Sequence, residues 1–282
     1  MSAPHDARRR ACAAFFCISN LAFCIAVTSC GVPKAITLPS DPGTPLSDFA
    51  SVQAQVSSAC SGVRTLKGPL GLSGRAGGER VRGRVVVGFE RPSSMRLEGV
   101  APFGPPVFIL AGRGDSATLV LQREERIIRN APPEAILEAL TGVSLGPADL
   151  LAAFTGCVLP APRPTGGRVH PGDVASIDIE SDDQGQPRRA TLFLKRAGSR
   201  WQLFAARRDR WQMEYAFGTG MFPQSVRLVS LSPDVPVNIA AALTEIETNV
   251  DIDPAAFTVQ EQKNLEPLTL EELRQAGPLR EQ

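Results

Sequence analysis

The chain has 282 residues, and its 30 Lys and Arg residues nearly balance its 29 Asp and Glu residues, which leaves a formal net charge of +1. A nucleic-acid-binding domain needs a strong basic bias, so the composition argues against that class of partner. The 25 Gly and 24 Pro residues favour many turns over long helices, in a chain long enough for one large β domain.

Residues 1–29 have the order of basic, apolar and small residues that marks a secretory signal. Three arginines at 8–10 form the basic part, and residues 11–27 form the apolar part. The end of this segment, Val-Thr-Ser-Cys at 27–30, resembles a bacterial lipobox, in which the cysteine is lipidated and becomes the new N-terminus. We therefore predict a lipoprotein signal peptide over 1–29 and a palmitate-bearing Cys30. A signal cleaved without lipidation and an uncleaved helix are the alternatives, although a membrane span needs about 20 apolar residues.

The segment after the signal predicts a tether and then a helix. Residues 30–45 contain Gly, Pro, Ser and Thr with little apolar pattern, which is typical of a flexible tether. In residues 46–60, apolar side chains recur at spacings of three and four, which indicates one helix face. Once Cys30 carries lipid, two cysteines remain in an oxidising compartment, and we predict a Cys60–Cys157 disulfide. Two separate buried thiols are the alternative.

Strand patterns begin near residue 63 and fall into two groups. The first group covers 66–75, 80–90, 94–101, 106–112, 116–122 and 125–129. Proline near the start and glycine after the end then predict two apolar helices, 133–141 and 147–155, before a Pro/Gly-rich loop over 158–172. The second group covers 174–181, 189–197, 200–208, 211–217, 224–231 and 237–252. Residues 253–282 are predicted to form a polar C-terminal extension with a short helix at 269–276.

These elements predict a mainly β (α+β) fold in one domain, residues 46–252. Long runs of adjacent antiparallel strands curl toward closure, because closing removes exposed strand edges. We expect an open, incomplete antiparallel β-barrel of about 11 strands, with an N-terminal helix and a two-helix lid over its open side.

Several short motifs follow one another between residues 63 and 160. They are Leu97-Glu98-Gly99-Val100-Ala101-Pro102-Phe103-Gly104, Ala117-Thr118-Leu119, Leu140-Thr141-Gly142, Pro147, Leu150-Leu151 and Phe154-Thr155-Gly156. This series resembles the LolB family of the LolA/LolB superfamily, outer-membrane lipoproteins that accept other lipoproteins from a soluble carrier. After residue 170 only the strand pattern is similar.

The resemblance implies a half-barrel with a hydrophobic cavity for acyl chains beneath the helical lid. Apolar residues of the strands and of the two lid helices are the candidates for its walls: Leu97, Leu119, Leu121, Ile136, Leu137, Leu140, Leu150, Leu151, Phe154, Leu192 and Leu194. The family has a tryptophan in the second lid helix, where this chain has Ala153 or Phe154, so the resemblance leaves the packing of the lid open. The alternative is a solid core without a cavity.

The resemblance also implies a protruding loop that touches the bilayer through a leucine in a Pro-Leu-Gly turn. The matching residues here are Pro102, Phe103 and Gly104, and the apolar residues Val107 and Phe108 follow. Phe103 in place of leucine is a mild departure, because an aromatic side chain suits a membrane interface. In the alternative reading, Phe103 folds back into the core.

A basic cluster lies in the second strand group. It consists of Arg188, Arg189, Lys195, Arg196, Arg200, Arg207, Arg208 and Arg210. Such a cluster attracts anionic lipid head groups, or it forms the solvated outer face of edge strands.

Signals for catalysis are nearly absent. His170 is the one histidine after residue 29, and the sequence shows neither a cluster of metal ligands at zinc-site spacing nor a Gly-X-Ser-X-Gly elbow. We expect no enzymatic activity, no catalytic residue, no metal and no cofactor.

The sequence thus predicts a lipid-anchored, monomeric protein of the outer membrane that faces the periplasm. Gly31 follows Cys30, where an aspartate would mark inner-membrane retention in some bacteria. The protein would bind acyl chains of lipoproteins or lipids and assist their transfer into the outer membrane, with membrane lipid, a lipoprotein cargo and a soluble periplasmic carrier as partners. The alternative is a structural or sensory envelope lipoprotein that uses the same barrel as a protein-binding module, with residues 253–282 as the contact segment.

Overall fold

The computed structural model describes residues 35–76, 78–183, 186–232, 236–260 and 264–276. The predicted signal peptide over 1–29 and the predicted lipidation site Cys30 lie outside these residues.

Strands dominate the described residues. They are β1 (Thr44–Pro45), β2 (Thr65–Ala76), β3 (Glu79–Glu90), β4 (Ser94–Val100), β5 (Phe108–Arg113), β6 (Ser116–Leu121), β7 (Arg126–Ala131), β8 (Arg163–His170), β9 (Val174–Asp183), β10 (Gln186–Ala197), β11 (Arg200–Arg208), β12 (Trp211–Phe217), β13 (Pro223–Ser230), β14 (Val237–Leu243), β15 (Glu247–Thr248) and β16 (Glu266–Pro267). The helices are α1 (Phe49–Ser61), α2 (Pro133–Thr141), α3 (Pro147–Thr155) and α4 (Leu270–Ala276), with a 3₁₀ turn, η1 (Pro254–Phe257).

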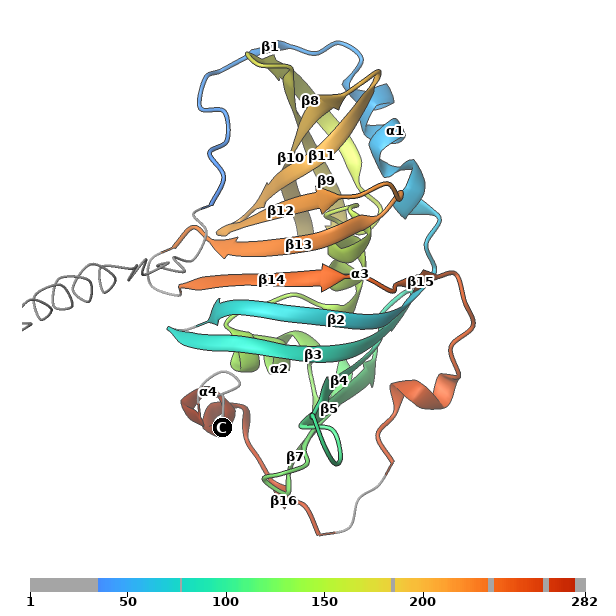
Figure 1. Cartoon of the computed structure of the whole chain (residues 1–282), viewed down its shortest axis with the longest axis vertical. Helices are drawn as coiled ribbons and strands as arrows, with labels where there is room; N and C mark the ends of the chain where they lie inside the picture. Colours follow the sequence, from blue (N-terminus) through green and yellow to red (C-terminus); the bar gives the residue numbers. More distant parts are fainter. Residues whose placement is uncertain (1–34, 77, 184–185, 233–235, 261–263, 277–282) are drawn as a thin grey trace, which may run out of the picture. The chain divides into compact units, whose positions relative to one another are not determined.

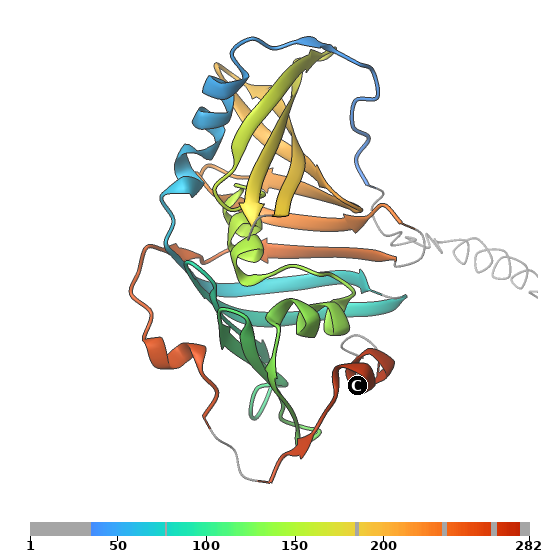
Figure 2. The ribbon, with the colours of Figure 1, turned by 180° about the vertical axis from the view of Figure 1, so that it is seen from behind.

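All the described strands belong to one open sheet (Figure 1). Its order is β1-β8-β9-β10-β11-β12-β13-β14-β2-β3-β4-β5-β6-β7-β16, and β15 pairs with β2. Two antiparallel meanders, β2 to β7 and β8 to β14, join where β14 pairs with β2. The sheet curves around α2 and α3, which connect the two meanders (Figure 2). The predicted open, mainly β architecture is confirmed.

Alternation of side chains gives the sheet a buried face and a wet face. In β9, Ala175, Ile177 and Ile179 are buried, whereas Asp178 between them is exposed. A strand places successive side chains on opposite faces, so this period of two directs the apolar set toward the core. The main core lies between the sheet and the helices α1, α2 and α3.

The predicted number of about 11 strands was wrong, because the described residues form 16. Three of these strands, β1, β15 and β16, are pairings of two residues each. Another, β8, lies in the segment 158–172, which the sequence predicts as a loop. Its sequence, Arg-Pro-Thr-Gly-Gly-Arg-Val-His, has no alternating apolar pattern, and it becomes a strand through pairing with β9 and β1.

The helices also differ from the predicted arrangement. The N-terminal helix α1 contacts β8, β11 and α3, and the C-terminal helix α4 packs against α2 (Figure 2). The lid therefore consists of α2 and α3 with a further helix behind α2. None of the helices in the described residues has both the length and the apolarity that a bilayer crossing requires.

The described part of the predicted tether, residues 35–45, contacts the sheet. Leu38 is buried against Phe193 and Ala205. The backbone N–H of Ile36 donates to Glu214 Oε1 at 2.7 Å, and β1 pairs with β8. These contacts fasten the segment that leads toward residue 30.

The C-terminal segment after β15 also folds onto the sheet. η1 packs on β4 and β5, where Phe257 is 1% exposed. β16 then pairs with β7 and covers this edge of the sheet. Leu268 and Leu273 are buried in the main core, so the described segments 254–260 and 264–276 complete the structure at this end.

Candidate functional site

An apolar cavity lies between the curved sheet and the lid helices α2 and α3. Its volume is about 170 Å³, and among its 21 lining residues only Thr141 has a polar side chain. The walls come from β2, β3, β4, β5, β12, β13 and β14, and from the segment 137–154. A lining of this kind suits hydrocarbon rather than a polar ligand.

The structure brings about half of the predicted cavity residues to this cavity. Its lining includes Leu97, Leu137, Leu140, Leu150 and Phe154. The other predicted residues, Leu119, Leu121, Ile136, Leu151, Leu192 and Leu194, are buried in the core but do not line the cavity. For the four strand residues the reason is their place in the sheet, because β6 and β10 lie away from the strands β14, β2 and β3 that form the cavity floor. Ile136 and Leu151 belong to α2 and α3 and pack into the core beside the cavity.

Sequence reasoning missed most of the cavity floor. It is formed by pairs at i and i+2: Leu70 and Leu72, Val85 and Val87, Val226 and Leu228, and Ile239 and Ala241. Such pairs share one face of a strand, so the alternation could have identified them. Which strands form the floor depends on the closing pair β14–β2, which joins residues far apart in the sequence.

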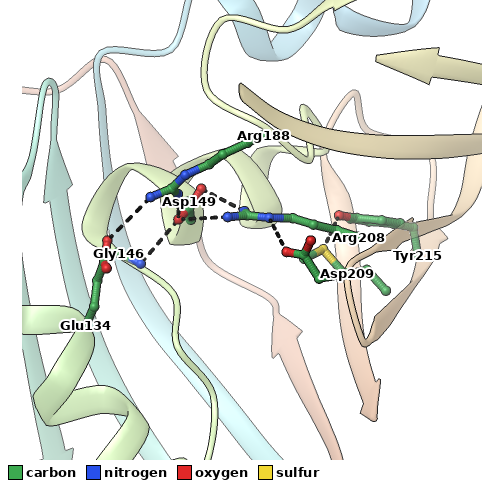
Figure 3. A network of polar contacts seen from close by, with 8 residues as sticks. Glu134, Gly146, Asp149, Arg188, Arg208, Asp209 and Tyr215 are labelled. Atoms are coloured by element: carbon green, nitrogen blue, oxygen red, sulfur yellow. Dashed lines mark hydrogen bonds and ion pairs between the residues drawn. The ribbon is translucent and has the colours of Figure 1, made fainter. Parts of the chain in front are cut away.

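The lid helix α3 is fixed at its N-terminal end by a buried carboxylate (Figure 3). The side chain of Asp149 is 3% exposed and lies between two arginines. Arg208 Nη1 donates to Asp149 Oδ1 at 2.8 Å, and Arg188 Nη1 donates to Asp149 Oδ2. The backbone N–H of Gly146 also donates to this carboxylate, at 3.3 Å. These bonds connect α3 to β10 and β11.

Two opposing effects act on the pKa of Asp149. Burial raises the pKa, but the hydrogen bonds and charges of Arg208 and Arg188 outweigh burial and hold it below its ordinary value. The carboxylate is therefore charged at neutral pH and balances part of the positive charge of the two arginines.

The C-terminal end of α3 is fixed by a disulfide. Cys157 is bonded to Cys60 near the end of α1, with a Cα–Cα distance of 5.7 Å and a sequence separation of 97 residues. The predicted disulfide is confirmed. With Asp149 at one end and Cys157 at the other, α3 is tied to the rest of the domain at both ends.

The other lid helix, α2, has weaker polar ties to the sheet. Glu134 lies 3.8 Å from Arg188, and Glu138 lies 4.0 Å from Arg210, so both ion pairs are long and partly exposed. Gly142 ends α2 in the left-handed conformation, with φ of 74°, which suits glycine. Of the two lid helices, α2 therefore has the weaker polar ties to the sheet, and it is held mainly by its buried apolar side chains and by α4.

The predicted membrane loop connects β4 to β5. Phe103 at its tip is 91% exposed, and Pro102 and Gly104 on either side are also exposed. Val107 is half-buried. Phe108 is not part of the protruding loop, because it is the first residue of β5 and lines the cavity.

His170 lies between an acid and a hydroxyl. Its Nδ1 is 3.1 Å from Asp41 Oδ1, and its Nε2 is 2.9 Å from Ser176 Oγ. Nucleophilic hydrolases use this order of groups together with backbone donors for an oxyanion. Ser176, however, lies within β9, where it pairs with Arg168 on one side and Phe193 on the other. The three side chains therefore fasten residue 41 to the β8–β9 hairpin.

No protein-family model matches the sequence, and no curated protein matches it. Among solved structures, the LolA superfamily protein NE2245 from Nitrosomonas europaea is similar over 74% of this chain and 97% of its own, with a TM-score of 0.50 and 12% identity. A DUF1329 family protein from Desulfovibrio piger is similar over 79% of this chain and 100% of its own, with a TM-score of 0.48 and 11% identity. A putative outer membrane lipoprotein-sorting protein domain from Vibrio parahaemolyticus is similar over 74% of this chain and 95% of its own, with a TM-score of 0.47 and 9% identity. The expected resemblance is confirmed at the level of the fold: this chain has the fold of the LolA superfamily protein NE2245.

Proposed function

We propose that this chain is a lipid-anchored protein of the cell envelope that binds acyl chains in its apolar cavity and assists their transfer into the outer membrane. The observation that carries the proposal is the cavity itself, which has one polar side chain, Thr141, among 21 lining residues. The predicted lipid on Cys30 would hold the domain at the membrane, on the periplasmic side. The similar fold of the LolA superfamily protein NE2245 supports this assignment.

The volume of the cavity determines how binding would proceed. At about 170 Å³ it is close to an engineered cavity of roughly 150 Å³ that holds benzene, and below the roughly 300–1,000 Å³ of ordinary ligand pockets. It therefore holds part of an acyl chain, and a whole chain requires the lid to move. Because α3 is tied at both ends, α2 and the linker 142–146 are the parts that would move away from the sheet.

Burial of the chain would supply the free energy of transfer. Each Å² of apolar surface removed from water contributes about 25 cal/mol, so cargo would leave a site that buries less of it. Phe103 would then enter the bilayer interface next to the delivered chain, since aromatic side chains are favoured there. The mechanism needs no covalent step, catalytic residue, metal or cofactor, and we propose none.

The rival function, a protein-binding module that uses residues 253–282, receives less support. In the described residues, η1, β16 and α4 of this segment are packed on β4, β5, β7 and α2 of the same chain. Those surfaces are not available to a partner unless the segment detaches.

A matched pair of substitutions in β14 tests the proposal. Ala241 lines the cavity, and its neighbour Ala242 is exposed on the opposite face of the same strand. We expect the full-length protein to take up a fluorescent fatty acid in a titration. Ala241→Phe fills the cavity and should weaken uptake at least about tenfold, whereas Ala242→Phe should bind as the unaltered protein does.

Circular dichroism would establish that both variants fold. The proposal is contradicted if the unaltered protein takes up no fatty acid, or if the folded Ala241→Phe variant binds it unchanged.

A further inference from the structure

A polar hollow lies beside the apolar cavity. Its volume is about 490 Å³, and it is more open to solvent than the apolar cavity. Three arginines, Arg188, Arg208 and Arg210, and three acids, Glu134, Asp149 and Asp209, line it. The hollow therefore carries charges of both signs in equal number.

The hollow and the cavity share a wall. In the segment that joins α2 to α3, Val143 and Leu145 line the apolar cavity, whereas Ser144 between them lines the polar hollow. On β12, Trp211 lines the hollow and Met213 lines the cavity. These two side chains share one face of the strand, about 7 Å apart, since a strand rises roughly 3.3 Å per residue.

The charges differ in how far they are already neutralised. Asp149 and Arg208, with side chains 3% and 7% exposed, form a buried ion pair, to which Arg188 adds a second cation and Asp209 a second anion. The guanidinium of Arg210 is different: its side chain is 47% exposed, it lies 4.0 Å from Glu138, and it stacks over Trp211 at 5.6 Å from the ring centroid. Arg210 can therefore reach a ligand in the hollow.

Acidic groups also face the mouth of the hollow. The side chain of Glu134 is 46% exposed and makes a long contact of 3.8 Å with Arg188. The side chain of Asp209 is 75% exposed and lies 3.7 Å from Arg208 Nε. A purely anionic ligand would contact Arg210 but approach these two carboxylates. A purely cationic ligand would be attracted by the two carboxylates but repelled by Arg210. A group with a phosphate and an ammonium a few bonds apart would complement both signs.

We propose that this hollow binds the zwitterionic phosphate–ammonium head group of a phospholipid whose acyl chain occupies the adjacent cavity. The inference rests on the proposed function and narrows its cargo, because the lipid part of a lipoprotein has no such head group. Arg210 binds the phosphate, and Glu134 and Asp209 attract the ammonium. The shared wall lets one molecule occupy both compartments.

Binding of three lipids with identical acyl chains tests the inference. The full-length protein in detergent is titrated with spin-labelled phosphatidylethanolamine, phosphatidylglycerol and diacylglycerol. We expect phosphatidylethanolamine to bind about tenfold more tightly than either of the others. Arg210→Gln should bring phosphatidylethanolamine down to the affinity of diacylglycerol. Arg200→Gln, which alters an exposed arginine at the start of β11, should keep the preference.

The outcomes separate this inference from the proposed function. If none of the three lipids binds, the head-group site is wrong, and the fatty-acid titration decides separately whether the acyl-chain site stands. If all three bind equally, or if Arg210→Gln keeps the full preference, the head-group site is wrong and the acyl-chain site stands. A preference for phosphatidylglycerol would show an anion site and would also contradict the zwitterion assignment.

Discussion

Phe103 carries the membrane-contact part of the proposed function, because its side chain is 91% exposed at the tip of the β4–β5 loop. Burying a phenylalanine side chain contributes about 1.5–3 kcal/mol, which corresponds to roughly a tenfold to hundredfold effect on membrane contact. We predict that Phe103→Glu slows delivery of a fluorescent lipid to acceptor vesicles by at least about tenfold. Phe103→Leu should deliver at nearly the original rate. Equal rates for the glutamate variant and the unaltered protein would remove the loop from the mechanism.

Asp149 is the residue on which the position of α3 depends most. Asp149→Asn removes the buried charged partner of Arg208, whose side chain is 7% exposed, and leaves this arginine the longer 3.7 Å ion pair with the exposed Asp209. Removing one partner of a buried ion pair costs about 3–5 kcal/mol, and we expect a loss of that size in urea unfolding. Asp115→Asn, in an exposed turn, should change the free energy of unfolding by less than about 0.5 kcal/mol. A loss that small for Asp149→Asn would show that the network does not hold the lid.

The lowered pKa of Asp149 gives the same network a pH dependence. A carboxylate with a depressed pKa stabilises the fold above its ordinary value of 3.8, and that stability is lost as the pH falls through the lower folded-state value. The gap in unfolding free energy between the unaltered protein and Asp149→Asn should therefore be widest near neutral pH and shrink below pH 3.8. A gap that does not change with pH would contradict the assignment.

Single residues differ in how well their roles follow from the sequence. Cys60 and Cys157 could be predicted as a pair because only these two cysteines follow the predicted signal peptide and lipidation site. Arg188 and Arg208 belong to the basic cluster that was predicted either to bind lipid head groups or to form a solvated outer face. In the structure, both arginines contact the buried side chain of Asp149. Asp149 and Arg208 are 59 positions apart in the sequence, so no local pattern predicts that they lie side by side.

At the scale of elements, the disulfide couples α1 to the lid. The loop that it closes spans 97 positions, and removing such a bridge costs about 2–5 kcal/mol. We predict that the Cys60→Ala/Cys157→Ala double variant loses stability in this range. It should also show faster amide hydrogen exchange in α3 than the unaltered protein, since one end of the helix is released. Unchanged exchange in α3 would mean that Asp149 alone fixes the helix.

Elements with clear end signals could be predicted closely. The predicted helices 133–141 and 147–155 coincide with α2 and α3, because proline begins each one and a left-handed glycine ends it. β8 could not be predicted, since its pairing with β9 rather than its own side chains makes it a strand. The helix expected at 269–276 exists as α4, but its packing on α2 is a long-range contact without a local signal.

At the scale of the whole domain, the side-chain patterns of the strands and the two apolar helices were enough to predict an open, mainly β sheet with a helical lid. The existence of the cavity was not predictable in the same way. It depends on how far α2 and α3 stand from β14, β2 and β3, a distance set by the Asp149 network, the disulfide and α4 together. The same contacts determine which part of the lid can move.

The most direct test of the account is photo-crosslinking of a diazirine-bearing palmitate to the full-length protein, with the modified residues identified by mass spectrometry. We predict adducts on both walls of the cavity: on Leu140 in the lid, and on Leu228 and Ile239 in the sheet. Adducts confined to Phe103 and other exposed residues, with none in the cavity, would contradict acyl-chain binding beneath α2 and α3.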